Sequence, residues 1–265
     1  MHFTRAIVRP PSSTFADGLT SSGLGVPDLS LALEQHEGYC RMLERLGLSL
    51  LRLPPDPAFP DSTFVEDAAI VTGHGAILTR PGAPSRAGEV TSLGEALCRW
   101  FPELDRIVAP GTVDGGDVCE AGDHFFIGVS DRTNEEGAAQ LGRWLKARDY
   151  TSSVIDIQQM PGILHLKTGL SWLGGRRLIA WPEVAGHEAP FDYAQGRLRG
   201  WDVVQVPKGE EYAANCILVN DRVLIARGFP KTASLLRGHG IEVAELEMSE
   251  YRKMDGGLSC LSVRW

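Results

Sequence analysis

The chain has 265 residues, of which 43% are hydrophobic and 23% charged, as is usual for a globular protein that buries a sizeable core. Its formal net charge of −8 at pH 7 argues against nonspecific nucleic-acid binding and fits a cationic small ligand. The sequence has neither the roughly 20 consecutive apolar residues of a membrane span nor a signal-peptide core. We therefore expect a cytoplasmic protein with one domain over residues 1–265 and no nucleic-acid or membrane partner.

The N-terminal part of the chain predicts a strand, a loop, a helix and a second strand. The stretches "FTRAIVRP" (residues 3–10) and "LSLLRLP" (48–54) have the apolar content of short strands. Residues 28–47 between them carry apolar side chains at helical spacing. The stretch "PSSTFADGLTSSGLGVPD" (11–28) is rich in Gly, Ser and Thr and follows neither period, which predicts a loop.

A single pattern of elements then repeats along the chain. Each repeat opens with a polar residue, continues as an apolar run and a tight turn rich in Gly, Asp or Asn, and enters a second strand. An amphipathic helix follows in most repeats, and a further apolar strand closes each of them. The repeats span residues 65–101, 115–148, 166–186 and 213–240, and their polar openers are Asp67, Asp117, Thr168 and Asn215. A spacing of about fifty residues between openers indicates a propeller or an array.

The two ends of the chain complete a fifth repeat. The C-terminal "DGGLSCLSVRW" begins like another repeat and then stops, while the N-terminal strand, helix and second strand supply the missing elements. We therefore expect the last blade to be closed by both termini. In such a ring the openers point toward one axis, and Cys260 takes the opener position of the fifth repeat.

The five cysteines are odd in number and form no CxxC pair, which argues against a disulfide framework and against a structural zinc site. Cys40 and Cys98 fall in helical runs, and Cys119 and Cys216 fall in strand-like runs. We expect these four to be buried thiols that pack as small apolar side chains. Cys260 stands apart because it follows a Gly-Gly pair and faces the predicted axis.

Phosphate-binding, dinucleotide-binding, zinc-protease and serine-hydrolase motifs are absent from the sequence. Among the seven histidines, His74 and His124 fall in predicted hairpin turns, and His36 and His239 fall at helical positions. We expect these four to be solvated. His165, in "PGILHLKTG", directly precedes the third repeat, where it is either a functional residue or the polar end of a strand.

Arginines and carboxylates complete the set of candidate groups. Arg86 and Arg132 each follow the second strand of a repeat and precede its helix, and this matching position indicates a shared pocket rim. Acidic side chains cluster at the start of the first two repeats: Asp61, Glu66, Asp67, Asp114 and Asp117.

Eight short strings now resemble one family, in order and at matching spacing over essentially the whole chain. They are "DGLTSS", "FPDSTFVED", "RPGAPSRAGE", "GTVDGGD", "DRTNEEGA", "LHLKTGL", "EYAANCI" and "SEYRKMDGGLSC". The family is that of the dimethylarginine dimethylaminohydrolases, which belong to the pentein superfamily of guanidine-modifying enzymes. The resemblance implies a five-bladed α/β propeller with ββαβ repeats, in agreement with the repeats found above. It also implies hydrolysis of N-ω-methylated arginines to citrulline and an amine, without a metal or organic cofactor. A homodimer is one possible assembly, which the sequence does not determine.

The resemblance implies ten site residues. Cys260 would be the nucleophile, His165 the general acid and base, and Asp114 the carboxylate that steadies His165. The other seven would bind a substrate with charges at both ends. Asp67, with Glu66, would hold the guanidinium, Arg86 and Arg132 the α-carboxylate, and Asp61 with the backbones of Leu19 and Met254 the α-amino group.

Two other functions remain open at this stage. Another pentein enzyme, an arginine deiminase or an amidinotransferase, would use similar groups, although arginine deiminases are typically longer. A non-catalytic binding propeller would share the fold, but it would have no reason to keep Cys260, His165 and Asp114 together.

The loop "FADGLTSSGLG" is predicted to be a lid, with Leu19 as its large apolar side chain near the pocket. A charged reaction benefits when a lid expels water, because ion contacts strengthen as the local dielectric falls. The alternative is a static surface loop.

Replacing the nucleophile provides the first test. Cys260→Ser should retain the fold and lose turnover by orders of magnitude, because a hydroxyl has no comparable anion population near pH 7. Cys119→Ser and Cys216→Ser are the controls, and they should change mainly the stability. Substantial turnover by Cys260→Ser in a steady-state citrulline assay would exclude the covalent mechanism.

Overall fold

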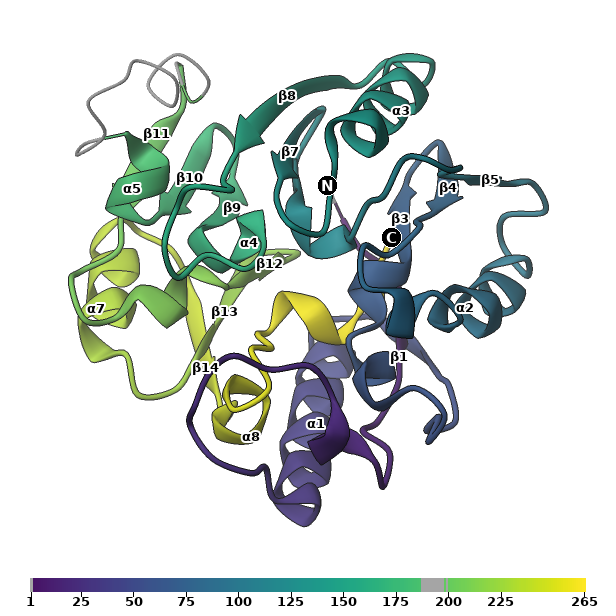
Figure 1. Cartoon of the computed structure of the whole chain (residues 1–265). Coiled ribbons are helices and arrows are strands. Elements are labelled where there is room, and N and C mark those ends of the chain that lie inside the picture. Colours follow the sequence, from purple (N-terminus) through teal and green to yellow (C-terminus); the bar gives the residue numbers. More distant parts are fainter. Residues whose placement is uncertain (1, 187–197, 199) are drawn as a thin grey trace.

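The computed structural model describes residues 2–186, 198 and 200–265, which fold as five small sheets around one axis (Figure 1). Each sheet has three strands. Its middle strand pairs antiparallel with one neighbour and parallel with the other. The expected five-bladed α/β propeller is therefore confirmed.

The strands of each sheet follow the predicted repeats. The first four sheets contain β3 (Ala69–Thr72), β4 (Gly75–Leu78) and β5 (Leu104–Arg106); β6 (Val118–Ala121), β7 (His124–Val129) and β8 (Thr151–Asp156); β9 (Leu170–Gly174), β10 (Arg177–Ala180) and β11 (Asp202–Gln205); and β12 (Ile217–Val219), β13 (Arg222–Ala226) and β14 (Val243–Leu246). The fifth contains β15 (Val263–Arg264), β1 (Arg5–Val8) and β2 (Ser49–Arg52). Both termini thus build one blade, as expected from the sequence.

Helices surround the sheets. The long ones are α1 (Leu29–Arg45), α2 (Glu89–Leu97), α3 (Glu135–Lys146) and α7 (Pro230–Gly238), and they lie with the short α5 (Pro182–Ala185) at the rim of the ring (Figure 1). The short helices α4 (Leu166–Gly169) and α8 (Ser249–Arg252) lie closer to the C-terminal segment. Among the described residues, no helix is both long and apolar enough to cross a membrane.

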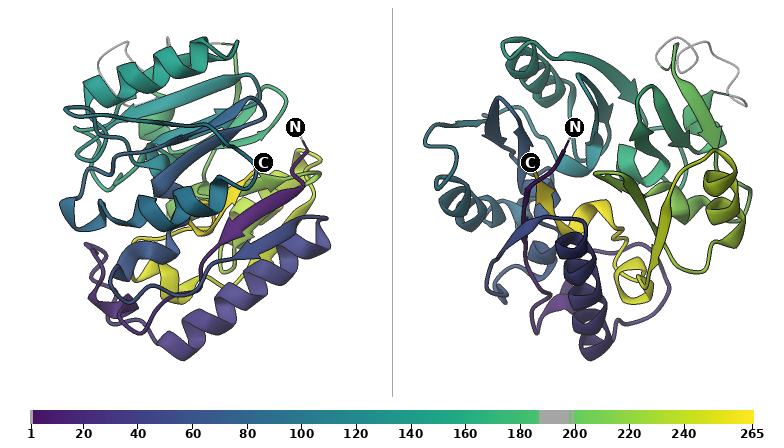
Figure 2. Two further views of the ribbon diagram at one scale, coloured as in Figure 1. Left: turned by 90° about the vertical axis from the view of Figure 1, so that its right-hand side faces the viewer. Right: turned by 180° about the vertical axis from the view of Figure 1, so that it is seen from behind.

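The alternation of hairpin and crossover explains the pairing pattern. A tight turn joins the first two strands of each of the four internal repeats, so these strands run antiparallel. The turn between β12 and β13 contains Asn220, whose φ of 56° lies in the left-handed region that asparagine tolerates. A helix carries the chain from the second strand to the third, which makes that pair parallel. Figure 2 shows the helices packed against the outer side of the sheets.

Polar side chains at the openers connect neighbouring repeats around the axis. Asp67 accepts a hydrogen bond from the Gly116 backbone N–H at 2.7 Å. Asp117 accepts one from the Leu166 backbone N–H at 2.9 Å. Asn215 accepts one from the Ser259 backbone N–H at 3.0 Å.

Hydroxyl groups make the two remaining connections. Ser171 Oγ donates to the Ala214 carbonyl at 2.7 Å and so links the third repeat to the fourth. Ser259 Oγ donates to Glu66 Oε2 at 2.9 Å and links the fifth repeat to the first. Each repeat therefore holds the start of the next, and Cys260 lies where the ring closes.

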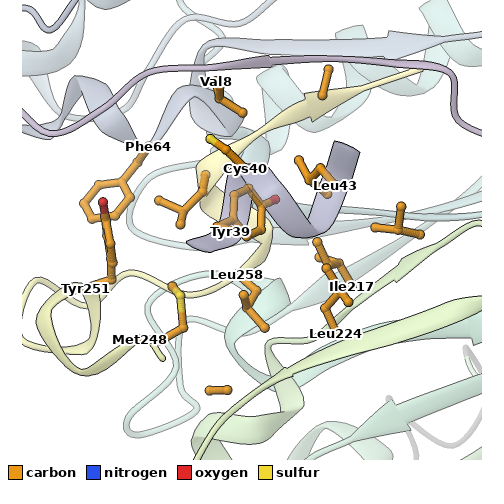
Figure 3. Packing of buried hydrophobic residues seen from close by; sticks show 14 of the residues in the cluster. Val8, Tyr39, Cys40, Leu43, Phe64, Ile217, Leu224, Met248, Tyr251 and Leu258 are labelled. Atoms are coloured by element: carbon orange, nitrogen blue, oxygen red, sulfur yellow. The ribbon is translucent and has the colours of Figure 1, made fainter. Parts of the chain in front are cut away.

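An apolar cluster joins the fifth blade to the strands of the fourth beneath α1. Tyr39, Cys40 and Leu43 of α1 belong to one buried cluster with Val8 of β1 and Leu258 of the C-terminal segment (Figure 3). The Tyr39 hydroxyl also hydrogen-bonds to Ser262 Oγ at 2.6 Å. This packing fixes the segment that carries Cys260.

Two expectations about exposure are wrong. Cys98 is exposed rather than buried, because it caps the C-terminal end of α2. His36 is buried rather than solvated, because it lies on the inner face of α1 beside Cys40. Burial lowers the pKa of His36 to about 4. A helical position alone does not reveal which face meets the core.

The closing blade provides a stability test. Ile7 is fully buried on β1 and pairs with Val263 of β15 and Leu51 of β2. Ile7→Ala should lower the free energy of unfolding by about 2–5 kcal/mol, and Ile7→Val by only about 0.5–1.5 kcal/mol. Urea denaturation measures both values. Equal losses for the two variants would contradict cavity formation as the cause.

Candidate active site

A cleft at one end of the ring brings together eight of the ten predicted site residues. Its lining combines residues of the 11–28 loop, the first two repeats, the segments that precede the first and third repeats, and the C-terminal segment. The lining residues are Leu19, Asp61, Phe64, Asp67, Arg86, Arg132, Leu164, His165, Met254, Asp255, Gly256 and Cys260. Asp114 lies behind His165, and Glu66 lines a different cavity.

His165 and Asp114 form a hydrogen-bonded pair. His165 Nε2 lies 3.1 Å from Asp114 Oδ2, and Asp114 is fully buried. Asp114 Oδ1 accepts a second hydrogen bond from the Gly82 backbone N–H at 2.8 Å. Gly116 lets the imidazole approach, because a Cβ there would lie 2.7 Å from His165 Nδ1. These contacts hold the imidazole in one orientation.

The same surroundings keep His165 protonated. Burial by itself would lower the pKa of His165, but the negative charge of Asp67 and the hydrogen bond to Asp114 outweigh burial and raise the pKa to about 9. At neutral pH the imidazole therefore carries a proton that it can donate.

Asp67 is an ionised carboxylate at the wall of the cleft. Burial would raise its pKa, but the charges of Arg86 and His165 and its hydrogen bonds lower it to about 2. Its Oδ2 accepts from Arg86 at 2.6 Å, and its Oδ1 accepts from the Gly116 backbone N–H. A cation in the cleft would meet a fixed negative charge here.

Arg86 is buried and already paired. Its guanidinium donates to Asp67 and to both carboxylate oxygens of Glu89, at 3.0 and 2.7 Å in the latter case. It also donates to the Phe64 carbonyl at 3.2 Å. Glu89 was not among the predicted site residues, although its position three residues after Arg86 indicates a possible ion pair on one helical turn.

Arg132 differs from Arg86 in its surroundings. It is half-buried at the cleft, and within the described part of the chain its guanidinium makes no hydrogen bond or ion pair. It is therefore the more available arginine for an anionic group of a ligand.

Cys260 is a partly exposed side chain with a neutral thiol. Burial, followed by the negative charges of Glu66 and Asp67, raises the pKa of Cys260 to about 12. The Gly257 backbone N–H lies 3.5 Å from Cys260 Sγ and acts in the opposite direction, because it stabilises the thiolate. The empty cleft therefore disfavours the thiolate, and a bound cation would favour it.

Glu66 faces away from the cleft. Its Oε1 lies 2.5 Å from Lys167 Nζ, and its Oε2 accepts from Ser259 Oγ. The neighbouring pairs Glu66–Asp67 and Ser259–Cys260 thus divide between two cavities, with Asp67 and Cys260 on the cleft side. In this conformation, Glu66 cannot contact a ligand in the cleft directly.

Backbone and carboxylate groups form the outer end of the cleft. The Leu19 backbone N–H donates to both oxygens of Asp61 at 3.1 Å. Met254 is buried beneath this end, with an exposed fraction of 3%. Burial raises the pKa of Asp61, opposed by the charge of Arg86. Acidic and backbone groups therefore meet here, as the sequence analysis expected.

Asp67, Asp114 and His165 also present ligand atoms within 4.8 Å of one another, an arrangement that can bind metals. Both oxygens of each carboxylate already accept a hydrogen bond, from Arg86, His165 or a backbone N–H. With a guanidinium and a protonated imidazole in place, the cluster fits proton transfer better than cation binding.

The pH dependence of this cluster is testable. The pKa of His165 rises from an ordinary 6.5 to about 9 on folding, so its stabilising contribution is complete below pH 6.5 and is lost as the pH rises through about 9. Asp114→Asn should lower the pKa of His165. The free energy of unfolding should then fall less steeply between pH 6.5 and about 9 than it does in the wild type. NMR titration of the imidazole and urea denaturation measure the two effects. The control Asp221→Asn, at an exposed site, should leave the His165 titration unchanged.

The sequence matches one family model and two curated bacterial relatives that share a name. The family model for arginine deiminase matches residues 53–217. An N(G),N(G)-dimethylarginine dimethylaminohydrolase from Pseudomonas aeruginosa is 44% identical over 264 residues, 99% of this chain and 100% of the relative. A protein of the same name from Streptomyces coelicolor is 35% identical over 98% of this chain and 96% of the relative.

Solved structures agree with these matches. The Pseudomonas aeruginosa enzyme, as a cysteine-to-serine variant complexed with citrulline, gives a TM-score of 0.91 at 44% identity, covering 100% of both chains. A histidine-to-glycine dimethylarginine dimethylaminohydrolase, as an adduct with S-methyl-L-thiocitrulline, gives 0.92 at 44% identity over 99% of this chain and 100% of the other. The N-terminal domain of ArgZ, at 20% identity and a TM-score of 0.85, covers 98% and 97% and shares the fold. Sequence identity over nearly the whole chain, joined to the same fold, places this protein in the family of the dimethylarginine dimethylaminohydrolases.

Proposed function

We propose that the protein hydrolyses N-ω-methylated arginines, giving citrulline and methylamine or dimethylamine. One observation carries this proposal: the ionised Asp67, the protonated His165 and the thiol of Cys260 line a single cleft. A guanidinium fits this combination, because it brings the positive charge that Asp67 attracts and that the thiolate needs.

The substrate is proposed to lie with its guanidinium against Asp67 and its amino-acid end against the loop. Arg132 would bind the α-carboxylate, and Arg86 would contribute its charge from within its network with Asp67 and Glu89. Asp61 and the backbones of Leu19 and Met254 would receive the α-amino group. Opposite charges then meet at both ends of the substrate.

Glu66 takes a less direct part in this proposal. It would act on the guanidinium through its charge, from behind Asp67, while Lys167 and Ser259 hold it in the second cavity. The contact that the sequence resemblance implied for Glu66 remains a prediction.

Binding and activation of the nucleophile are proposed to be coupled. A thiolate between Glu66 and Asp67 is unfavourable in the empty cleft, since both carboxylates raise the pKa of Cys260. The guanidinium would offset these charges and lower that pKa, so that the thiol loses its proton to solvent water and the thiolate forms beside the carbon that it attacks.

The chemistry then follows two steps. The Cys260 thiolate attacks the guanidinium carbon, and His165 donates its proton to the departing amine, leaving a covalent thiouronium. The neutral imidazole next takes a proton from water, the hydroxide attacks the same carbon, and the C–S bond breaks to release citrulline. Asp114 orients the imidazole and stabilises its charge in both steps.

These steps need neither a metal nor an organic cofactor, and we predict that the protein uses none. The cytoplasmic location and an assembly as a homodimer are also predictions.

The substrate's amino-acid end provides the decisive assay. Purified protein is incubated with asymmetric dimethylarginine, monomethylarginine, arginine and agmatine, and the ureido product is quantified. Agmatine lacks the α-carboxylate and should be processed very poorly. Arg132→Ala should reduce kcat/KM for methylarginine by about 10- to 100-fold, the effect of one charge-assisted contact, and change agmatine turnover little.

Two outcomes would contradict the proposal in different ways. Arginine turnover above that of both methylarginines would indicate a deiminase. Agmatine turnover equal to that of methylarginine would refute the role of Arg132. Arg86→Ala is a poorer probe, because it would leave Asp67 and Glu89 as unpaired buried carboxylates and destabilise the fold.

A further inference from the structure

Asp255 joins the loop over the cleft to the segment that carries the nucleophile. Its Oδ2 accepts hydrogen bonds from the Ser21 backbone N–H at 2.5 Å, from Ser21 Oγ at 3.1 Å and from Thr20 Oγ1 at 3.2 Å. The neighbouring Lys253 carbonyl accepts from Thr20 Oγ1 at 2.8 Å and from Ser22 Oγ at 2.6 Å. Three consecutive loop residues are therefore bound to two residues of the C-terminal segment.

The opposite side of the loop is tied to a different part of the ring. The Leu19 backbone N–H donates to Asp61, just before the first repeat. The loop residues 19–22 thus bridge two carboxylates, and the carboxylate on the C-terminal side is Asp255.

Asp255 has a backbone conformation that few residues adopt. Its φ of 55° lies in the left-handed region, which costs most L-residues free energy but is tolerated by Asp, Asn and Gly. This conformation turns the chain at the edge of the cleft, which Asp255 itself lines.

The path from Asp255 to the nucleophile is short and tightly packed. Gly256 and Gly257 follow, and a Cβ at either position would lie within 2.4 Å of a neighbour, the Phe64 ring at 2.3 Å and the Asn215 amide at 2.4 Å. The Gly256 carbonyl accepts a hydrogen bond from the Tyr212 hydroxyl at 2.7 Å. Gly257 then presents its N–H to Cys260 Sγ. These contacts leave residues 255–257 little room to move independently of that N–H.

We propose that Asp255 is a positioning residue that couples closure of the loop to placement of the Gly257 N–H against the Cys260 sulfur. When Thr20 and Ser21 bind its carboxylate, the segment 255–257 is held and the N–H supports the developing thiolate. When the loop opens, the segment loses this restraint. The catalytic consequence of this coupling rests on the proposed function, whereas the structural coupling does not.

The neighbouring charges do not provide an alternative link. The charged groups that act on the Cys260 thiol are Glu66, Asp67 and Lys167, and none of them contacts loop residues 19–22. The connection between the loop and the sulfur therefore runs through the backbone from Asp255 to Gly257.

Two variants test the coupling from its two sides. Asp255→Asn tolerates the same φ and keeps an acceptor oxygen, but removes the charge that strengthens the bonds to Ser21. Thr20→Val combined with Ser21→Ala removes the two hydroxyl groups that donate to Asp255, keeps the Ser21 backbone N–H, and leaves residues 253–260 unchanged. Asp17→Asn, at an exposed site in the same loop, is the matched control.

Residue-resolved amide exchange by NMR is the first readout and requires no turnover. In both test variants, the backbone amides of residues 19–25 and of Gly257 should exchange about 10-fold faster than in the wild type. This is the effect expected when one hydrogen bond is lost. The control should match the wild type at both places. Faster exchange in the loop with unchanged exchange at Gly257 in both variants would overturn the coupling and leave Asp255 as a loop anchor.

Steady-state kinetics with asymmetric dimethylarginine is the second readout. If Asp255 only anchors the loop, both variants should raise KM and leave kcat unchanged. The coupling requires kcat to fall as well, by about 10-fold in Asp255→Asn and by less in the loop variant. Unchanged kcat in both variants would refute the catalytic part of the proposal. Wild-type protein without activity on any methylarginine would instead refute the proposed function, and the exchange experiment would still decide the coupling.

Discussion

The structure depends on hydrogen bonds that tie the start of each repeat to the next around the axis. Asp67, Asp117 and Asn215 accept backbone N–H groups of the following repeat, and Ser171 and Ser259 make the other two connections. These bonds are buried, where an unpaired polar group would cost more than it does in water. Small sheets of three strands could not by themselves set their mutual angle, so the bonds define the ring.

The candidate site uses the same positions for chemistry. Asp67 both closes a connection between repeats and lines the cleft, and Cys260 stands where the fifth repeat returns to the first. A charge needed by the fold is thereby fixed next to the reacting atoms, and no reorganisation is needed to place it. The cost is a thiol with a high pKa until a cation arrives, which protects an empty site from unwanted reactivity.

The alternation of side chains along the inner segments separates two environments. At Glu66–Asp67 and at Ser259–Cys260 the first residue faces one cavity and the second faces the other. The Glu66–Lys167 ion pair and the Ser259 hydroxyl thus support the residues of the cleft from behind. The loop adds a wall on the open side, where it contacts Asp61 and Asp255. The cleft is consequently built from both ends of the chain and from its middle.

The sequence by itself determined the five repeats, because strand pairs with tight turns and apolar periodicity are local properties. The spacing of the openers and the complementary termini also predicted how the ring closes. The identity of most site residues came from the family resemblance, and eight of the ten line one cleft. Tertiary structure alone decided that Arg86 is bound by Asp67 and Glu89, that Glu66 turns away, that His36 is buried and Cys98 exposed, and that Asp255 meets the loop. A sequence pattern fixes which side chains share a face, but the partner of that face depends on segments far away in the chain, which only the closed ring brings together.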